Sequence, residues 1–99
     1  MERAEYDLMA AVEDRMWWYR GLHALATGAW LRARRDCSFG PTTSPALDAG
    51  CGTGGLLRQL SVAAPEATLV GLDFAESAAA VAHDKSGRAV TVGSVNALP

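Results

Sequence analysis

Apolar residues in the first third of the chain recur at helical spacing. No proline interrupts residues 3–35, and apolar positions such as Met9 and Met16 repeat along one face. This pattern predicts two helices, or one helix bent near Gly21. Residues 36–45 then read DCSFGPTTSP, and the two prolines in this cluster of turn formers cannot continue a helix. We expect a linker or entry loop there.

Short apolar runs alternate with helical segments in the second half of the chain. An apolar run at 45–49 leads into a glycine-rich loop, the β-branched run ATLVGLD ends at Asp73, and AVTVG occupies 89–93. Helical patterns fill about 55–64 and about 76–85 between these runs. Strands joined by helical crossovers of this length are typical of a parallel sheet. The sequence therefore predicts an α/β fold preceded by N-terminal helices.

Composition and charge exclude several classes of protein. The 99 residues are 49% hydrophobic and 20% charged, which fits a folded globular chain. A formal net charge of −2 provides no basic field for nucleic acid or an anionic membrane. No basic region followed by an apolar run opens the chain, and no apolar stretch approaches a membrane span. We therefore expect a cytoplasmic protein without nucleic-acid or membrane partners.

The cysteines and histidines do not form a metal-ligand pattern. Cys37 and Cys51 fit neither a disulfide framework nor a metal spacing, so both are expected to be free thiols. His23 and His83 are isolated and are interpreted as surface or satisfied side chains. The sequence therefore predicts no metal site.

The stretch ALDAGCGTGGLL places an aspartate directly before the glycine loop. Gly50, Gly52 and Gly55 match the spacing of a dinucleotide fingerprint, and Asp73 follows about 20 residues later, where an acid accepts ribose hydroxyls. Asp48, however, would repel a pyrophosphate at this loop. A ligand that carries a sulfonium and an ammonium in place of phosphates reverses the sign of that interaction. S-adenosylmethionine (SAM) has these groups and also a ribose.

Three segments together resemble the first three motifs of the class I SAM-dependent methyltransferases. They are LDAGCGTGGLLRQL, VGLDFAESAAAVA and VGSVNALP, and the resemblance covers roughly residues 45–99. It implies a Rossmann-like parallel sheet, of which these motifs supply the first three strands, and SAM as the cofactor. The implied cofactor-binding residues are Asp48, Gly50, Cys51, Gly52, Gly54, Asp73, Phe74, Ser94 and Val95.

The resemblance also implies a role for each of these positions. Asp48 and the glycines of the first motif line the methionine half of SAM, Asp73 binds the ribose, and Phe74 flanks the adenine. Many relatives carry an acid where this chain has Ser94. A neutral hydroxyl is a weaker acceptor for the adenine amino group than a carboxylate. Val95 is expected to offer its backbone N–H to the adenine edge.

The N-terminal segment MWWYRG has two interpretations. Clustered aromatic side chains on a helix most often anchor it by packing on the sheet. Alternatively, similar leader helices in the resembling family cover the SAM site, where Tyr19 would donate a hydrogen bond and Arg20 would pair with the methionine carboxylate. The predicted organisation is a helical leader at 1–35, a linker at 36–45 and the SAM-binding part at 46–99.

The predicted activity is transfer of a methyl group from SAM to a small molecule. Two alternatives stay open: a non-catalytic module that binds SAM or a partner, and an NAD(P)-binding oxidoreductase module. No catalytic base is identified from the motifs. Because the family continues with a fourth strand beyond NALP, we expect an N-terminal part of a methyltransferase. Alone, it would be inactive and would self-associate through the unpaired sheet edge at Leu47.

Overall fold

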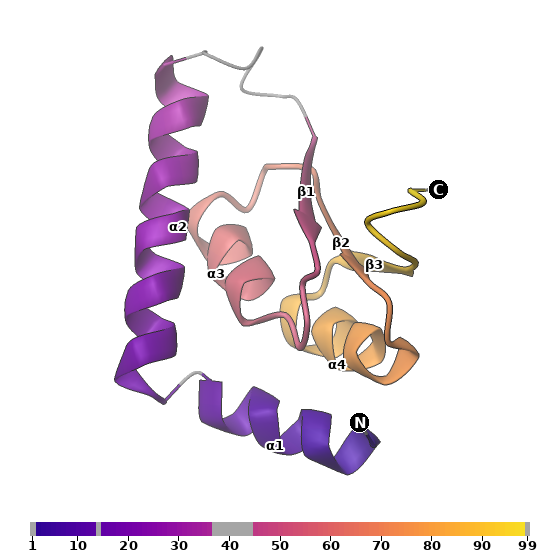
Figure 1. Ribbon diagram of the computed structural model, residues 1–99. Helices are drawn as coiled ribbons and strands as arrows, with labels where there is room; N and C mark the ends of the chain where they lie inside the picture. Colours follow the sequence, from indigo (N-terminus) through magenta and orange to yellow (C-terminus); the bar gives the residue numbers. More distant parts are fainter. Residues whose placement is uncertain (1, 14, 37–44, 99) are drawn as a thin grey trace.

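The computed structural model describes residues 2–13, 15–36 and 45–98. Helices and strands follow one another in the order expected for an α/β chain, which confirms the predicted fold class (Figure 1). The elements are α1 (Arg3–Glu13), α2 (Trp17–Asp36), β1 (Ala46–Ala49), α3 (Gly55–Ala63), β2 (Leu69–Asp73), α4 (Glu76–Ser86) and β3 (Ala89–Val92).

The leader consists of two helices. α1 ends at Glu13 and α2 begins at Trp17, so the alternative of one helix bent near Gly21 is wrong. Gly21 lies inside α2, where a glycine is tolerated at a cost of about 1 kcal/mol relative to alanine. α2 ends at Asp36 with Arg34 and Arg35 in its last turn, as the favourable interaction of cations with a helix C-terminus leads us to expect. The expected linker at 36–45 therefore begins one residue too early, since Asp36 belongs to α2; Pro45 precedes β1, and residues 37–44 lie outside the described residues.

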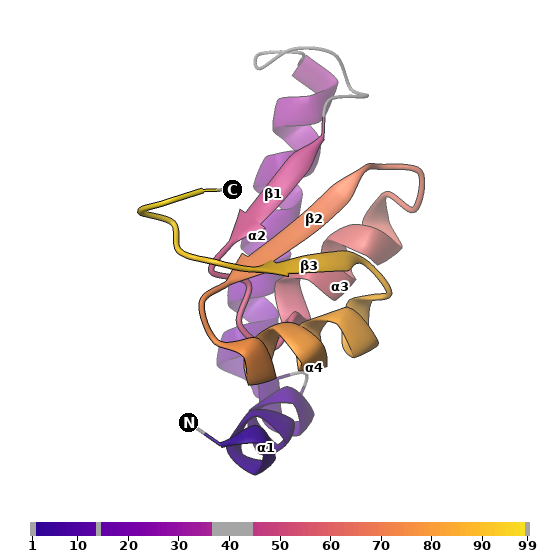
Figure 2. The same cartoon turned by 90° about the vertical axis from the view of Figure 1, so that its right-hand side faces the viewer.

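The three strands form one parallel sheet in the order β1-β2-β3 (Figure 2). Asp48 is in register with Gly71, and Asp73 is in register with Val92. Because all three strands run in one direction, the loops after Ala49, Asp73 and Val92 gather at one end of the sheet. This is the end at which ligands bind in open parallel sheets.

The helices lie on one face of the sheet (Figures 1 and 2). α3 and α4 pack directly on the strands, while α2 packs against α3 and α1 against α4. The buried core lies between α3 and the sheet, and Trp30 of α2 packs against it. Leu57 at the centre of this core is fully buried. The core consists of Leu57, Leu60, Ala64, Ala67 and Leu69.

The apolar side chains on the other sheet face differ in exposure: Leu72 of β2 is only 1% exposed, whereas the edge strand β1 is less covered. Leu47 of β1 is 50% exposed because its side chain alternates away from the helices. A small cavity on this face is lined by Leu47, Val70, Leu72, Thr91 and Leu98, together with Gly71. Within the described parts of the chain, β1 pairs only with β2 and is therefore an edge strand.

Candidate cofactor-binding site

The glycine loop connects β1 to α3 and has a backbone that requires glycine. Gly50, Gly52 and Gly54 have φ angles of 74°, 55° and 88°, in the left-handed region that residues with a Cβ rarely adopt. A Cβ at Gly54 would also lie 2.7 Å from the Cα of Ala82 in α4. At Gly50 and Gly52, nothing described lies within 4 Å of such a Cβ. The loop therefore packs against α4 at one end and leaves its first two glycines open to a ligand.

Asp73 holds the glycine loop and the end of β2 together. Its Oδ1 accepts a hydrogen bond from the backbone N–H of Gly52 at 3.1 Å, and its Oδ2 accepts one from the N–H of Ala75, also at 3.1 Å. The backbone carbonyl of Asp73 accepts a bond from the N–H of Gly93 after β3. The side chain is only 8% exposed. Asp73 thus links all three loops at the carboxyl end of the sheet, and each carboxylate oxygen keeps a second lone pair for a ligand.

Asp48 lies on the helix-covered side of β1. Its Oδ2 is buried and has no hydrogen-bond partner among the described residues. Burial raises the pKa of the Asp48 carboxyl; His23 of α2 opposes this increase, and the carboxylate of Asp73 adds to it. An unpartnered buried acceptor is costly, so a donor or cation at this position would be stabilising.

Cys51 is a buried thiol of the same loop. Burial raises its pKa to about 12, and the carboxylates of Asp48 and Asp73 add to the increase. Thiolate is therefore negligible at neutral pH, and Cys51 is not an activated nucleophile. Among the described residues Cys51 is a free cysteine, as predicted; Cys37 lies outside them.

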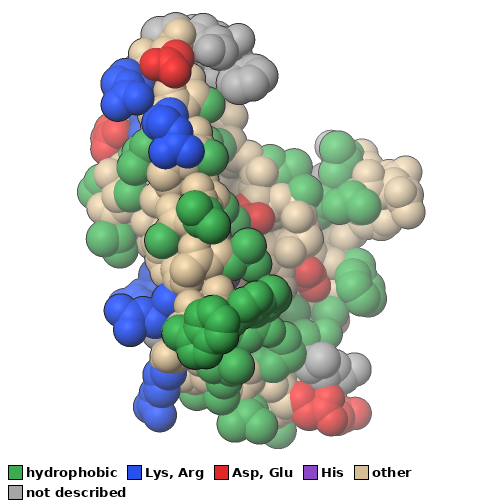
Figure 3. All heavy atoms as spheres, turned by 60° about the vertical axis from the view of Figure 1, so that its left-hand side comes forward, with side chains coloured by type: hydrophobic (Ala, Val, Ile, Leu, Met, Phe, Trp, Pro, Cys, Tyr) green, Lys and Arg blue, Asp and Glu red, His purple; other side chains and the backbone are tan. Residues whose placement is uncertain are grey.

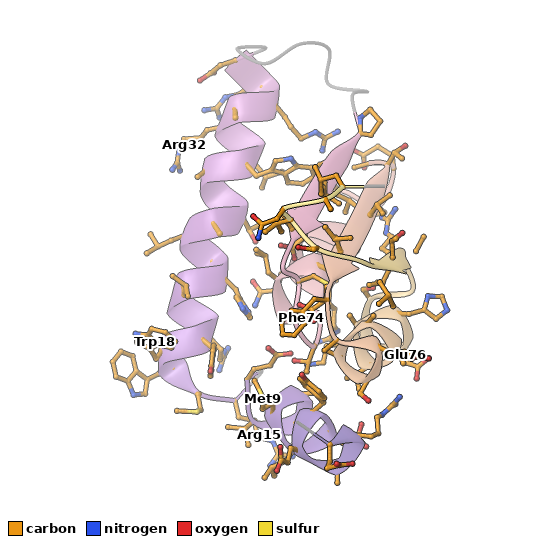
Figure 4. The ribbon with its side chains drawn as sticks, turned by 45° about the vertical axis from the view of Figure 1, so that its right-hand side comes forward. Met9, Arg15, Trp18, Arg32, Phe74 and Glu76 are labelled. Carbon is orange, nitrogen blue, oxygen red and sulfur yellow. The ribbon has the colours of Figure 1, made fainter. Side chains whose placement is uncertain are left out.

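The three residues expected at the adenine lie beyond the ends of β2 and β3. Phe74 is 80% exposed and, in the view of Figure 4, lies between the sheet and α1. The hydroxyl of Ser94 accepts a hydrogen bond from the N–H of Asn96 at 3.1 Å within a turn. Val95 is exposed in the same turn. Phe74 is thus available as an apolar wall, whereas one lone pair of the Ser94 hydroxyl is already in use.

A buried polar cluster behind the glycine loop was missed by the sequence analysis. The Thr53 hydroxyl donates to Glu13 Oε1 at 2.7 Å, and Lys85 Nζ donates to the same oxygen at 2.6 Å. Lys85 also donates to the carbonyl of Ala10 at 2.7 Å. In the sequence, Glu13 only interrupts an apolar row, and that polar residue on an apolar face was the available signal.

His23 corrects a second expectation. It was predicted to be a surface or satisfied side chain, but it is 9% exposed, and no described residue pairs with its Nδ1. Its ring lies against the start of α3, since a Cβ at Gly55 would be 2.7 Å from His23 Cε1. His83 agrees with the prediction: it is exposed, and its Nδ1 lies 2.8 Å from the carbonyl of Arg88.

The aromatic segment at the start of α2 is not a packing anchor on the sheet. Trp17 is 81% exposed and Trp18 is 52% exposed, and Figure 3 shows hydrophobic side chains gathered on this part of the surface. Only Tyr19 of this segment is half-buried, with Trp18 edge-on at 5.0 Å between ring centroids and His23 at 6.2 Å. Trp30, two-thirds of the way along α2, performs the anchoring instead.

Two kinds of feature are absent from the described part of the chain. Its His, Cys, Asp and Glu side chains form no group of three suited to a metal ion. None of its helices has the length and apolar character needed to cross a membrane.

Comparison with known proteins agrees with the geometry of this site. Residues 46–99, more than half of the chain, match a protein-family model described as a methyltransferase domain. The match begins at β1 and includes the glycine loop, Asp73 and the turn after β3. No curated protein matches the chain.

Proposed function

The chain belongs to the methyltransferase domain family, and we propose that its glycine loop, Asp48 and Asp73 bind SAM for methyl transfer to a small molecule. The observation that carries this proposal is the unpartnered, buried Oδ2 of Asp48 beside an open glycine loop. A dinucleotide would bring a pyrophosphate to this loop, next to a carboxylate. SAM would bring an ammonium and a sulfonium, whose charges complement Asp48.

The residues present fit SAM from end to end. Gly50 and Gly52 leave room for close approach of the methionine half, and Asp48 supplies an acceptor for its ammonium. Asp73 would accept the ribose hydroxyls with its remaining lone pairs. Phe74 offers an exposed apolar wall to the adenine, and Ser94 and Val95 lie after the next strand. Cys51 contributes loop backbone, because its thiol is protonated and turned into the protein.

When bound, SAM supplies an electrophilic methyl group for a displacement reaction. The described residues then have to hold the cofactor, align the acceptor and exclude water. Asp73 performs the first task by fixing the glycine loop relative to β2. Arg20, exposed in the first turn of α2, is our candidate partner for the methionine carboxylate. No described side chain is assigned as a catalytic base.

A small-molecule acceptor is supported by the charge of the chain. A net charge of −2 gives no basic surface for nucleic acid. The free thiol of Cys51 supports a cytoplasmic location as a further part of this proposal, because thiols stay reduced in that compartment.

Calorimetry with SAM and NAD tests the proposed cofactor directly. SAM should bind more tightly than NAD, and Asp48→Asn should weaken SAM binding while leaving or improving any NAD binding. Asp84→Asn, which removes an exposed carboxylate of α4, is the matched control and should change neither. Preferential binding of NAD by the unchanged protein would contradict the proposal and favour the oxidoreductase alternative.

A turnover assay separates an enzyme from a binding module. If the protein acts on a small molecule, transfer of labelled methyl from SAM to one of a panel of small acceptors should depend on Asp73. Tight SAM binding without transfer to any of them would support the non-catalytic alternative.

A further inference from the structure

The leader helix α1 contacts the glycine loop through a buried, charged side chain. Glu13, the last residue of α1, is 8% exposed and accepts the Thr53 hydroxyl at 2.7 Å. Thr53 itself is only 2% exposed and stands between Gly52 and Gly54, two of the positive-φ glycines. A residue 40 positions away thus bonds directly to the centre of the loop.

Lys85 of α4 makes the burial of Glu13 tolerable. Its ammonium lies 2.6 Å from Glu13 Oε1. Counting side-chain atoms alone, Lys85 is 12% exposed and Glu13 is 11% exposed. A buried carboxylate without a partner would be strongly destabilising, whereas a hydrogen-bonded ion pair offsets much of that cost. The ammonium also donates to the carbonyl of Ala10, which fixes the last turn of α1 against α4.

The first turn of α3 leaves no space for the Glu13 side chain to shift. A Cβ at Gly55 would lie 2.8 Å from Glu13 Cδ and 2.7 Å from His23 Cε1. A Cβ at Gly54 would meet the backbone of Ala82. The loop is therefore enclosed by α4 at Gly54 and by both leader helices at Gly55.

We propose that Glu13 is a positioning residue for the cofactor loop: it sets the loop conformation through the Thr53 hydroxyl, with Lys85 as its counter-ion. This proposal rests on the proposed SAM function for its ligand, although the loop conformation itself is independent of any ligand. Glu13 lies behind the loop and acts on the cofactor only through Thr53. The leader is then part of the binding apparatus and does not merely cover it.

The proposal has a reciprocal consequence. If the leader stabilises the binding-competent loop, cofactor binding must stabilise the docked leader by the same factor. SAM should therefore slow amide hydrogen exchange in α1, which is linked to the glycine loop by the bond between Glu13 and Thr53. Thr53→Val should largely abolish this protection.

The test compares Thr53→Val, which keeps the shape but removes the hydroxyl, with Thr53→Ser, which keeps the hydroxyl. Glu13→Gln removes the charge, and Glu5→Gln on the exposed side of α1 is the matched control. Glu13→Gln leaves the loop sequence unchanged, so amide NMR shifts of Gly52, Gly54 and Gly55 in this variant report the loop without ligand; calorimetry gives the SAM affinity of every variant. For Thr53→Val we expect about three- to tenfold weaker SAM binding, the effect of one lost hydrogen bond. Glu13→Gln keeps an acceptor oxygen for Thr53 but removes the counter-charge of Lys85, so the glycine amides should shift and SAM binding should weaken at least as much. The SAM affinities of Thr53→Ser and Glu5→Gln should resemble that of the unchanged protein.

Two outcomes have distinct meanings. If Thr53→Val and Glu13→Gln lower the melting temperature but leave the SAM affinity unchanged, and the glycine amides of Glu13→Gln do not shift, the cluster only stabilises packing, and the positioning role is refuted. If the unchanged protein binds no SAM, the proposed function fails, while the glycine amide shifts still decide whether Glu13 sets the loop.

Discussion

Replacement of Asp73 by asparagine should weaken both the fold and cofactor binding. The carboxylate accepts two backbone N–H bonds at 3.1 Å in a site that is 8% exposed. An amide offers one acceptor oxygen and turns its NH₂ toward the other N–H, so one hydrogen bond to a charged group is lost and the second becomes neutral. With about 1.5–3 kcal/mol for the first and roughly 1 kcal/mol for the second, the free energy of unfolding should fall by about 2.5–4 kcal/mol.

The effect on SAM is measured separately from the effect on stability. Loss of the charged acceptor for the ribose hydroxyls should weaken binding by about 1.5–3 kcal/mol, the range for hydrogen bonds to charged groups. Urea denaturation gives the first quantity, and calorimetry at a temperature where the variant is folded gives the second. Asp84→Asn, which removes an exposed ion pair to Arg3 at 3.6 Å, should cost under about 1 kcal/mol. Unchanged SAM affinity in a folded Asp73→Asn protein would refute the ribose assignment.

Three other predictions follow from Asp48, Cys51 and Leu47. Burial raises the pKa of the Asp48 carboxyl above its ordinary value of 3.8. Between that value and the raised pKa, the free energy of unfolding should fall as pH rises, because the unfolded chain releases this proton more readily, while SAM affinity should increase as the carboxylate forms. Asp48→Asn should flatten both pH profiles, the first measured by denaturation and the second by calorimetry. In a Cys37→Ser background, iodoacetamide should modify Cys51 on the order of 10³-fold more slowly in the native protein than in urea at pH 8, since its pKa is about 12; similar rates would contradict a buried thiol. The exposed edge at Leu47 should support self-association, which Leu47→Lys should reduce in sedimentation; a monomer at all concentrations would rule this out.

Much of the fold could be predicted because its signals are local. The β-branched run before Asp73 and the glycines after Ala49 directly specify a strand and a loop, and both lie where the pattern placed them. Helix ends depend on tertiary contacts. Gly21 is a plausible break by propensity, but the helix continues through it, and the leader breaks between Glu13 and Trp17 instead.

The candidate site was predictable where a motif lies within one segment. Asp48, the glycines and Asp73 all precede or follow strands, and parallel topology brings such positions together. Glu13, Thr53 and Lys85 come from three separate elements, and nothing in their spacing indicates that they meet. Their cluster exists only because α1 packs on α4 beside the loop. Similarly, Trp17 and Trp18 are large apolar residues of the kind usually found in a core, but the face of α2 that carries them points to solvent.

The central claim is that the glycine loop and Asp73 bind SAM, and an NMR titration of the whole chain with SAM tests it most directly. Saturable shifts should concentrate on the backbone amides of Gly50, Gly52 and Gly54, on Phe74 after Asp73, and on Val95 after β3. An equal titration with NAD should give smaller shifts at the loop, since its pyrophosphate meets the Asp48 carboxylate. Shifts from SAM that avoid the loop, or a stronger response to NAD at the same glycines, would contradict the account.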